Sequence, residues 1–258
     1  MNSLKLTEPL NLGLTLNSGQ VFDWSEKDGF WEGFIHGKKA RLSDSGEKLF
    51  FEGVEKKEIY DFLKLDENTH EILNKISSKN RDLFLKEMIK KYSGLRILNQ
   101  EPWECLISFI ISQNSSIKTI RKRIETLRGL KGGFPKPGRM ASFSEKDFKK
   151  MGFGYRSAYL KKTSEIVKGG FDLERLKKIS FEDALEELES LPGVGEKVAK
   201  CVMLFSLGFN SAFPVDVHIE RVMKKRYHVN KNIQEFAVKR FGPYAGYVQQ
   251  YLFLSDLH

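Results

Sequence analysis

The chain has 258 residues, of which 40% are hydrophobic, and it carries a formal net charge of +9 with a pI of about 9.3. That length allows one large domain or two smaller ones, and the hydrophobic fraction is ample for a real core. Uncharged runs such as residues 105–117 are too short and too polar to span a bilayer, so no membrane partner is expected. A basic balance favours an anionic partner, most often nucleic acid, with a solvated basic surface as the alternative.

The start of the chain lacks the basic residues and long apolar core that mark a signal peptide. Two cysteines occur, Cys105 and Cys201, and they lie far apart and match no zinc or iron–sulfur spacing. Such sparse thiols are ordinary for a reducing cytosol. These features predict a cytoplasmic protein without a cysteine-based zinc or iron–sulfur site.

Residues 1 to about 60 are predicted to form β structure. Residues 30–35 carry aromatic and β-branched side chains, and residues 48–51 follow after two turn-like sequences. An antiparallel sheet is the simplest arrangement for short strands separated by turns. From Lys56 onward the hydrophobic residues take helical spacing.

Beyond residue 101 the chain is predicted to be almost entirely helical, with a Gly/Pro loop at residues 129–138. The sequence therefore predicts an α+β fold. An N-terminal antiparallel β-sheet domain would cover residues 1–98, and an all-helical domain would cover residues 99–258. The predicted helices cover residues 103–111, 117–127, 155–167, 181–191, 198–207, 216–227 and 243–257.

The positive charge is concentrated in one segment. Residues 118–178 contain eighteen lysines and arginines against six acidic residues, whereas the rest of the chain has a small net negative charge. This distribution suits a face that docks on phosphates better than a generally soluble surface.

The most informative stretch is residues 191–197, LPGVGEK, between two helical patterns. Gly193 and Gly195 permit positive φ angles and leave backbone N–H groups exposed at the start of the helix that begins near Glu196. Such a helix N-terminus binds phosphate, so a helix–hairpin–helix unit can grip one DNA strand without reading its sequence. A simple turn between two helices is the alternative, but the spacing is more restrictive than such a turn needs.

Two residues of this region are candidates for catalysis. Lys197 lies in the first helical turn, where the helix dipole and burial disfavour an ammonium group and favour the neutral amine of a nucleophile. A lysine that only contacts phosphate is the alternative. Asp216 precedes the next helical pattern, where a cap would contribute about 1 kcal/mol. A carboxylate facing a sugar there could also stabilise positive charge on C1′, and the two roles are compatible.

These residues resemble a known family. Residues 191–197 together with 214–216 are similar to the helix-hairpin-helix, Gly/Pro–Asp superfamily of DNA glycosylases. Within it the chain resembles the eukaryotic-type 8-oxoguanine DNA glycosylases, which also occur in some bacteria and archaea, over nearly its whole length. The further blocks that carry the resemblance are residues 18–24 (SGQVFDW), 104–110 (ECLISFI), 152–156 (GFGYR) and 244–249 (YAGYVQ).

The resemblance implies a bifunctional DNA glycosylase and abasic-site lyase of base excision repair, with an N-terminal sheet like that of the TATA-binding protein. The damaged nucleotide is flipped out of the stack, Lys197 attacks C1′ and expels the base, and β-elimination from the Schiff base nicks the strand. Asp216 would orient the lysine and offset the oxocarbenium charge. The implied partner is double-stranded DNA containing oxidised guanine, bound by a monomer, with no metal or redox cofactor.

The resemblance also implies a pocket for the damaged base. The carbonyl of Gly19 would accept a hydrogen bond from the N7–H that only the oxidised base has, and Gln249 would contact the Watson–Crick edge. Phe253 and Cys201 would stack on opposite faces of the base. Without the family match, Gly19 would be a turn residue, Phe253 and Cys201 core residues, and Gln249 a surface amide.

Other residues would contact the DNA around the lesion. By the resemblance, Asn114 fills the gap left by the extruded nucleotide, Tyr155 wedges into the stack, and Arg156 contacts the orphaned cytosine. Tyr155 and Arg156 lie inside the basic segment, which supports them independently. His218 either contacts a phosphate or is a satisfied structural histidine.

The sequence departs from the family pattern beside Asn114. The family usually continues with more asparagines and, a few residues later, an arginine that helps select an opposite cytosine. Here Ser115 and Ser116 follow, and Thr119 stands at the place of the arginine. We therefore expect a weaker preference for cytosine opposite the lesion. The C-terminal cysteine cluster of the endonuclease III branch is absent, so no iron–sulfur cluster is expected.

Two alternatives remain open. An alkylbase (3-methyladenine-type) DNA glycosylase of the same fold lacks a lysine at the Lys197 position and does not nick abasic sites. A non-enzymatic helix-hairpin-helix module would bind duplex DNA without releasing a base, and it leaves Asp216, Gln249 and Gly19 unexplained.

Overall fold

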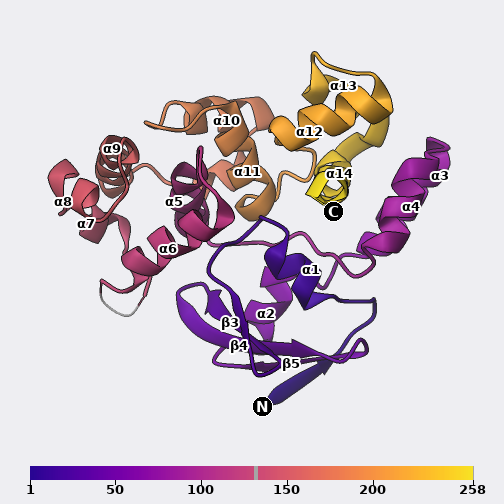
Figure 1. Ribbon diagram of the computed structural model, residues 1–258, viewed down its shortest axis with the longest axis horizontal. Helices are drawn as coiled ribbons and strands as arrows, with labels where there is room; N and C mark the ends of the chain where they lie inside the picture. The colour runs from indigo at the N-terminus through magenta and orange to yellow at the C-terminus, as the bar shows by residue number, and fades with distance from the viewer. Residues whose placement is uncertain (131–132, 258) are drawn as a thin grey trace.

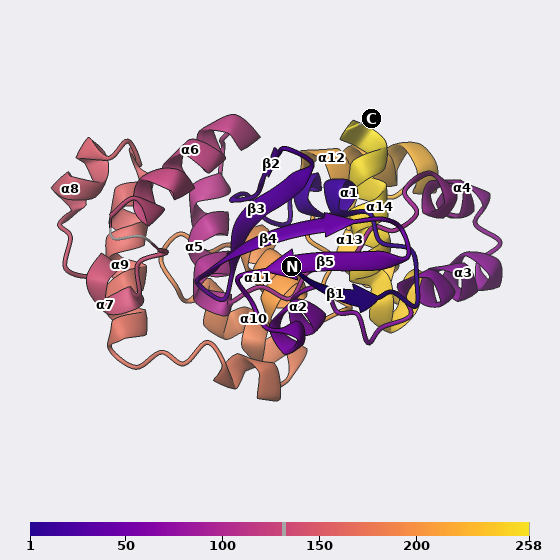
Figure 2. The same ribbon diagram turned by 90° about the horizontal axis from the view of Figure 1, so that it is seen from below.

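The computed structural model describes residues 1–130 and 133–257. Lys131 and Gly132, inside the loop predicted at 129–138, and His258 lie outside the described residues. An antiparallel sheet occupies the N-terminal end of the molecule and helices form the rest, so the predicted α+β fold is confirmed (Figure 1). Seen from the sheet side in Figure 2, the helices lie behind the sheet and extend beyond it on both sides.

Five strands form one antiparallel sheet in the order β1-β5-β4-β3-β2. The strands are β1 (Asn2–Lys5), β2 (Ser25–Lys27), β3 (Phe30–Ile35), β4 (Lys38–Asp44) and β5 (Lys48–Glu52). β3 and β4 are joined by a two-residue turn in which His36 and Gly37 have φ angles of 49° and 75°. Positive φ at both central residues matches the twist of a tight hairpin. Alternate residues of β4, Ala40 and Leu42, point into the core.

A short helix interrupts the region that the sequence predicts to be entirely β. α1 (Leu12–Asn17) is capped by Asn11, whose side chain accepts a hydrogen bond from the N–H of Leu14 at 2.9 Å. Its fully buried residues Leu12 and Leu16 lie one turn apart on the same face. The prediction was wrong here because six residues are too few to reveal a helical period.

The helices that follow cover almost all of the remaining chain. They are α2 (Lys56–Phe62), α3 (Thr69–Lys79), α4 (Leu83–Lys91), α5 (Pro102–Ser112), α6 (Ile117–Arg128), α7 (Pro137–Met140), α8 (Glu145–Lys150), α9 (Arg156–Lys168), α10 (Phe181–Glu189), α11 (Glu196–Ser206), α12 (Val217–Val222), α13 (Ile233–Phe241) and α14 (Ala245–Leu257), with 3₁₀ turns at Arg175–Lys178 and Gly242–Tyr244 and a π-turn at Met223–Tyr227. Within the described residues, no helix is long and apolar enough to cross a membrane.

The helices predicted beyond residue 101 begin and end within two residues of the observed ones, when the π-turn at Met223–Tyr227 is counted as a continuation of α12. The sequence analysis did not predict α3, α4, α8 and α13, although α3 and α4 each bury one face, through Leu73 and Ser77 in α3 and Leu85, Met88 and Ile89 in α4. The predicted loop is also shorter than expected, because Pro137 and Gly138 begin α7. Proline fits the first turn of a helix, where its missing N–H has no partner to lose.

Buried side chains form two clusters. The smaller one joins the sheet to α1 and α2, and its Trp24 stacks on Phe62 with ring centroids 5.9 Å apart. The larger one lies among the helices and includes Leu73 of α3 and Leu85 of α4. α4 packs beside α14 on the right of Figure 1. The domain boundary between residues 98 and 99 stays a prediction, because helices before it already contribute to the larger core.

Arg128, at the end of α6, connects the sheet region to the helices. Its guanidinium pairs with Asp23 and lies 2.9 Å from Glu104 of α5, while its carbon Cζ lies 3.9 Å from the ring centroid of Phe34. Burial raises the pKa of Glu104 to about 7, although Arg128 acts in the opposite direction. Burial also raises the pKa of Asp23. The carboxyl groups of Glu104 and Asp23 therefore keep their protons to higher pH than ordinary carboxyl groups do.

The stability of the protein is expected to fall as the pH rises from about 5 to about 8. Unfolded Glu104 loses its proton near pH 4.5, whereas the folded residue keeps it to about pH 7, so the folded state binds more protons in between. Glu104→Gln should therefore remove a decline of roughly 3 kcal/mol in unfolding free energy over that range. Urea unfolding across the range measures this, and parallel pH profiles for the two proteins would contradict it.

Candidate active site

The predicted hairpin forms the turn between α10 and α11. Gly193 has a φ of 81°, and a Cβ atom there would lie 2.5 Å from the Tyr159 ring, so only glycine fits. Gly195 is the N-cap of α11, and in the described part of the chain no side chain caps this helix and no atom lies within 4 Å of the Gly195 Cβ position. The first N–H groups of α11 thus have no side-chain partner, which supports the expected phosphate contact.

Lys197 is the second residue of α11 and is half-buried. Its Nζ lies 5.2 Å from the centroid of the Phe109 ring, which stacks on Phe205. The amine therefore points toward apolar walls inside the molecule. This placement favours a nucleophile over a lysine that only contacts phosphate.

Asp216 is the N-cap of α12, as the sequence predicts. Its Oδ1 accepts hydrogen bonds from the backbone N–H groups of His218 at 3.0 Å and Ile219 at 2.9 Å. These contacts hold the carboxylate at the start of the helix, where the helix dipole stabilises its charge. The carboxylate is therefore fixed in place before any substrate arrives.

The two candidate catalytic residues open onto one cavity of about 40 Å³. The structure brings together there every residue predicted for the nucleophile, the carboxylate and the base pocket. These residues are Gly19, Lys197, Cys201, Asp216, Gln249 and Phe253. They come from the turn after α1, from α11, from the start of α12 and from α14, which are far apart in the sequence.

Four further residues line the cavity that the sequence did not single out: Phe109, Phe205, Pro214 and Gln250. Phe109 and Phe205 belong to apolar helices, where no pattern distinguishes a cavity wall from the core. Pro214 lies inside the motif that precedes Asp216. For Gln250, the one available signal was its position directly after Gln249.

The turn that carries Gly19 is held by buried side chains. Gln250 donates from Nε2 to the carbonyl of Ser18 at 2.7 Å, and Gln20 donates from Nε2 to Oγ of Ser18 at 2.8 Å. Gly19 itself has a φ of 80°, which a side chain would strain, and a Cβ atom there would lie 3.3 Å from the Phe253 ring. The backbone at Gly19 is thus placed at the cavity by fixed contacts.

Gln249 presents an unused hydrogen-bond acceptor. Its Nε2 donates to the carbonyl of Pro214 at 3.1 Å, while its Oε1 is buried and has no partner in the described part of the chain. A buried acceptor without a donor costs about 1–3 kcal/mol, so it marks a place where a ligand group is expected. The N1–H and N2–H groups on the Watson–Crick edge of guanine are donors of the required kind.

Cys201 lies one helical turn after Lys197 and is buried. Burial raises the pKa of its thiol, and the neighbouring Lys197 acts in the opposite direction. The thiol is therefore uncharged at neutral pH and can pack against an aromatic ring.

Asn114 and Tyr155 lie together on the surface. Asn114 follows α5 in the left-handed conformation, with a φ of 46° that asparagine tolerates, and donates from Nδ2 to Oη of Tyr155 at 3.2 Å. The Tyr155 side chain is half-exposed. Gln113, the preceding residue, donates from Nε2 to the carbonyl of Gly193 at 2.8 Å. Asn114 and Tyr155 thus contact each other, and the residue before Asn114 is bonded to the hairpin at Gly193.

Arg156 does not lie with them on the surface. Only 3% of it is exposed, and its Nη2 contacts the carbonyl oxygen of Gln113 and lies 3.0 Å from Oγ of Ser115. Its contact with the orphaned cytosine stays a prediction, and the base would have to approach it from the Ser115 side.

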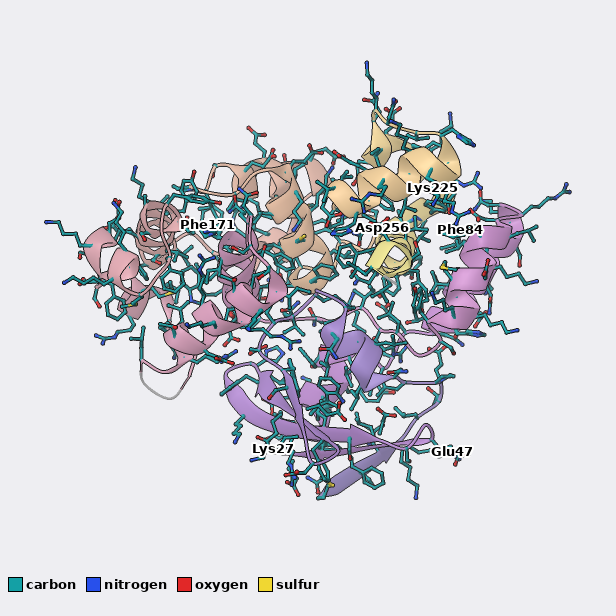
Figure 3. All side chains as sticks on the ribbon, in the orientation of Figure 1. Lys27, Glu47, Phe84, Phe171, Lys225 and Asp256 are labelled. Carbon is teal, nitrogen blue, oxygen red and sulfur yellow. The ribbon has the colours of Figure 1, made fainter. Side chains whose placement is uncertain are left out.

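His218 has a structural partner. Its Nδ1 lies 2.8 Å from Oδ2 of Asp256, which also pairs with Arg221 and is labelled near α14 in Figure 3. Its ring packs edge-on against Phe253 with centroids 5.5 Å apart. The structural interpretation of His218 is therefore supported, and a phosphate contact through its other ring nitrogen stays a prediction.

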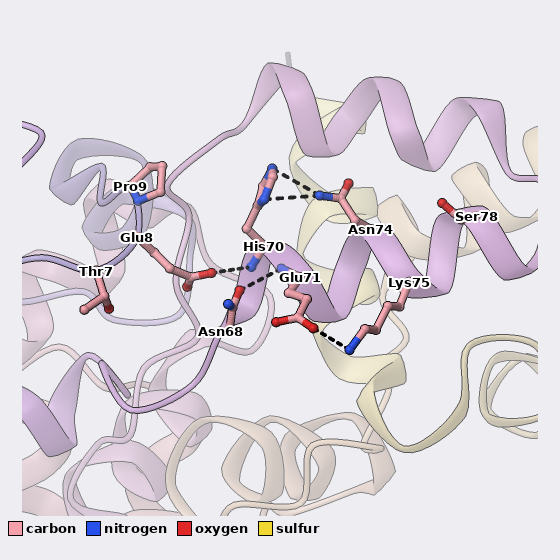
Figure 4. Close-up of a pocket in the computed structure, with 9 residues that line it drawn as sticks. All are labelled: Thr7, Glu8, Pro9, Asn68, His70, Glu71, Asn74, Lys75 and Ser78. Atoms are coloured by element: carbon pink, nitrogen blue, oxygen red, sulfur yellow. Dashed lines mark hydrogen bonds and ion pairs between the residues drawn. The ribbon is translucent and has the colours of Figure 1, made fainter.

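A hollow of about 560 Å³ lies away from these residues, where the segment after β1 meets α3 (Figure 4). Glu8 accepts hydrogen bonds there from the N–H groups of Thr69 and His70, and so caps α3. The polar groups of this hollow thus serve the start of α3, whereas the predicted catalytic residues lie at the smaller cavity that contains Lys197. Among the described residues, no three His, Cys, Asp or Glu side chains gather to hold a metal ion.

Comparisons with known proteins agree with this geometry. Residues 3–106 match the family described as 8-oxoguanine DNA glycosylase, N-terminal domain. Residues 107–242 match the family described as HhH-GPD superfamily base excision DNA repair protein. The N-glycosylase/DNA lyase OGG1 of Arabidopsis thaliana is 32% identical over 292 residues, which cover 98% of this chain and 80% of that protein.

Solved structures give the same result. The 8-oxoguanine glycosylase/lyase of Clostridium acetobutylicum in its apo form has a TM-score of 0.89 and 33% identity, covering 97% of this chain and 94% of that one. The same enzyme in complex with double-stranded DNA containing cytosine opposite 8-oxoG has a TM-score of 0.87 and 31% identity, covering 99% and 97%.

Proposed function

Because the chain belongs to the 8-oxoguanine DNA glycosylases of the helix-hairpin-helix GPD superfamily, we infer that it is a bifunctional DNA glycosylase and abasic-site lyase that removes 8-oxoguanine from double-stranded DNA. The observation that carries this inference is the cavity in which Lys197 and Asp216 meet Gly19 and Gln249. Cleavage of an N-glycosidic bond needs a nucleophile, a charge-stabilising carboxylate and groups that hold the base.

Catalysis begins when the damaged nucleotide is flipped out of the duplex and its base enters the cavity. The neutral amine of Lys197 attacks C1′, and the bond from C1′ to N9 breaks with its electron pair leaving on the base. Asp216, oriented by the N–H groups of His218 and Ile219, stabilises the positive charge at C1′. The sugar ring then opens to a Schiff base with Lys197. Loss of a C2′ proton expels the 3′ phosphate and nicks the strand.

The base is distinguished from normal guanine by hydrogen bonding. 8-Oxoguanine carries a proton on N7, which the carbonyl of Gly19 accepts, whereas the unprotonated N7 of guanine would face that oxygen as a second acceptor. Gln249 accepts from the Watson–Crick edge through the Oε1 that otherwise has no partner. A site that leaves buried polar groups unpaired with the wrong substrate discriminates more strongly than an apolar pocket can.

Phe253 has to move before the base can enter. The cavity of about 40 Å³ has room for roughly one water molecule, and the Phe253 ring lies against Gly19. Rotation of this ring away from Gly19 opens the space, and the ring can then stack on the face of the base opposite Cys201. The Phe253 ring also packs edge-on against His218, so this contact would change when the ring rotates.

Gln249→Leu is expected to lower kcat/KM for 8-oxoguanine excision by about 10–100-fold, because it removes the acceptor while keeping the size of the side chain. Nicking of a preformed abasic site requires no base recognition and should change by less than about 2-fold. Single-turnover assays on the two substrates measure both effects. An equal loss on both would show that the variant disturbs the site as a whole.

The proposed function is tested most directly with duplexes that carry 8-oxoguanine opposite each of the four bases. Base release together with strand nicking supports it, and binding without release would favour the DNA-binding module instead. We also propose that the enzyme acts as a monomer in the cytoplasm, because one chain supplies the whole cavity and its substrate is genomic DNA.

A further inference from the structure

A second arginine lies beside Arg156. Arg123 of α6 donates from Nη1 to Oγ of Ser115 at 2.7 Å and from Nε to the carbonyl of Gly152 at 3.1 Å. Nη2 of Arg156 lies 3.0 Å from the same Ser115 hydroxyl. Two guanidinium groups thus converge on one small side chain, directly after Asn114.

This convergence has no opposing charge. Neither Arg123 nor Arg156 pairs with a carboxylate within residues 1–130 and 133–257. Nε of Arg156 is buried without a hydrogen-bond partner, and burial together with the nearby Arg123 lowers the pKa of Arg156. Two guanidinium groups held together, with N–H donors still available, form a site for an electron-rich group.

The position of Arg123 on its helix is significant. It follows Thr119 by four residues, so the two lie on the same face of α6, one turn apart. The Thr119 side chain is short and exposed, and its hydroxyl bonds to Ser116 at the helix start. The longer side chain of Arg123, one turn further along α6, reaches the Ser115 region, as its contacts with Ser115 and Gly152 show.

The neighbouring residues indicate which part of the DNA would lie here. Asn114 and Tyr155 are expected to occupy the stack where the lesion has left, so the partner base of the lesion lies next to them. An orphaned cytosine presents two adjacent acceptors, O2 and N3, on its Watson–Crick edge. No other base offers this pair, because guanine and thymine carry an N–H donor at the centre of that edge and adenine has a single acceptor, N1, beside its amino group.

We propose that Arg123 is a specificity-determining residue that recognises, together with Arg156, a cytosine opposite the lesion, and that it supplies part of the selectivity lost with Thr119. This rests on the proposed function, because it assigns the opposite-base site of that same reaction. Arg123 would contact the cytosine from the side of Ser115, and Arg156 would contact it from the start of α9. The preference for cytosine is therefore weaker than with an arginine at position 119, but it is not abolished.

The test compares 8-oxoguanine opposite cytosine, adenine, guanine and thymine, for the unmodified protein and for Arg123→Ala. The variant should lower kcat/KM about 10-fold opposite cytosine and less than about 2-fold opposite the other three bases, since one good arginine–base contact contributes about 1–3 kcal/mol. Arg123→Lys should resemble Arg123→Ala, because an ammonium keeps the charge but not the planar pair of donors. Thr119→Arg should raise the cytosine preference above that of the unmodified protein.

Lys122→Ala is the matched control, an exposed neighbour on the same helix that should weaken binding equally for all four duplexes. Kd values measured in a Lys197→Gln background give the same opposite-base ratios without turnover. A loss that is equal across the four duplexes, full rescue by Arg123→Lys, or an unchanged ratio would overturn the proposal. Failure to release any base would instead count against the proposed function, and the Kd ratios would still decide the role of Arg123.

Discussion

Lys197→Gln should abolish base release and strand nicking, lowering the single-turnover rate by at least about 10³-fold. Glutamine keeps the length and polarity of the side chain nearly unchanged but has no amine to attack C1′. The aromatic ring of Phe109 lies 5.2 Å from Nζ and offers no nucleophile. The other nucleophilic side chain of the cavity, Cys201, is an uncharged thiol because burial raises its pKa, so it is not expected to replace the amine.

Borohydride trapping distinguishes a glycosylase that uses Lys197 as its nucleophile from an alkylbase glycosylase and from a DNA-binding module. The unmodified protein should form a covalent adduct with 8-oxoguanine DNA on reduction of the Schiff base, and Lys197→Gln should not. Lys57→Gln, on the exposed face of α2, is the control for a lysine far from the cavity and should trap normally. An alkylbase glycosylase or a binding module would give no adduct with either protein. Persistent trapping by Lys197→Gln would show that another amine is the nucleophile.

Asp216→Asn should lower the excision rate by about 10²–10³-fold while leaving the thermal stability almost unchanged. The carboxylate has two functions in the structure, since it caps α12 through two N–H contacts and lines the cavity beside Lys197. Asparagine is as good a cap as aspartate but carries no negative charge, so this variant removes only the charge. The rate loss therefore reports the stabilisation of C1′.

Asp216→Ala removes the cap as well and should lower the melting temperature by a further 2–4 °C or so, for a loss of about 1 kcal/mol. Ser180→Ala is the matched control. Ser180 caps α10 through a 3.1 Å hydrogen bond to the N–H of Asp183, so its loss should reduce stability without slowing excision. If Asp216→Asn were fully active and only Asp216→Ala were impaired, the residue would be a cap and nothing more.

Much of the candidate site could be predicted because its signals are local. The hairpin sequence places Gly193, Gly195 and Lys197 close together, and the structure shows a positive φ at Gly193, whereas Gly195 has an extended backbone with a φ of −103° at the start of α11. Asp216 caps the helix that follows it, as its position before an apolar period predicts. Helix propensity and residue spacing act over a few residues, so they can be recognised in the sequence without knowledge of the fold.

Other features could not be predicted because they depend on packing between distant segments. α1 was missed, and the burial of Arg156 against Ser115 was not foreseen. Arg123 gave no sequence signal, because one more arginine in a basic helix looks like the others. Its significance comes from the contact with Ser115, which depends on how α6 folds back on the loop before it.

Interactions within a few turns of chain set the order of sheet and helices, the hairpin, the lysine at the start of its helix and the aspartate cap, so these features could be predicted from the sequence. Packing between distant elements brings Gly19, Phe253 and Gln249 to the cavity at Lys197, and leaves Oε1 of Gln249 without a partner among the described residues. A cavity is a property of several elements packed together, and its shape follows from which side chains exclude one another.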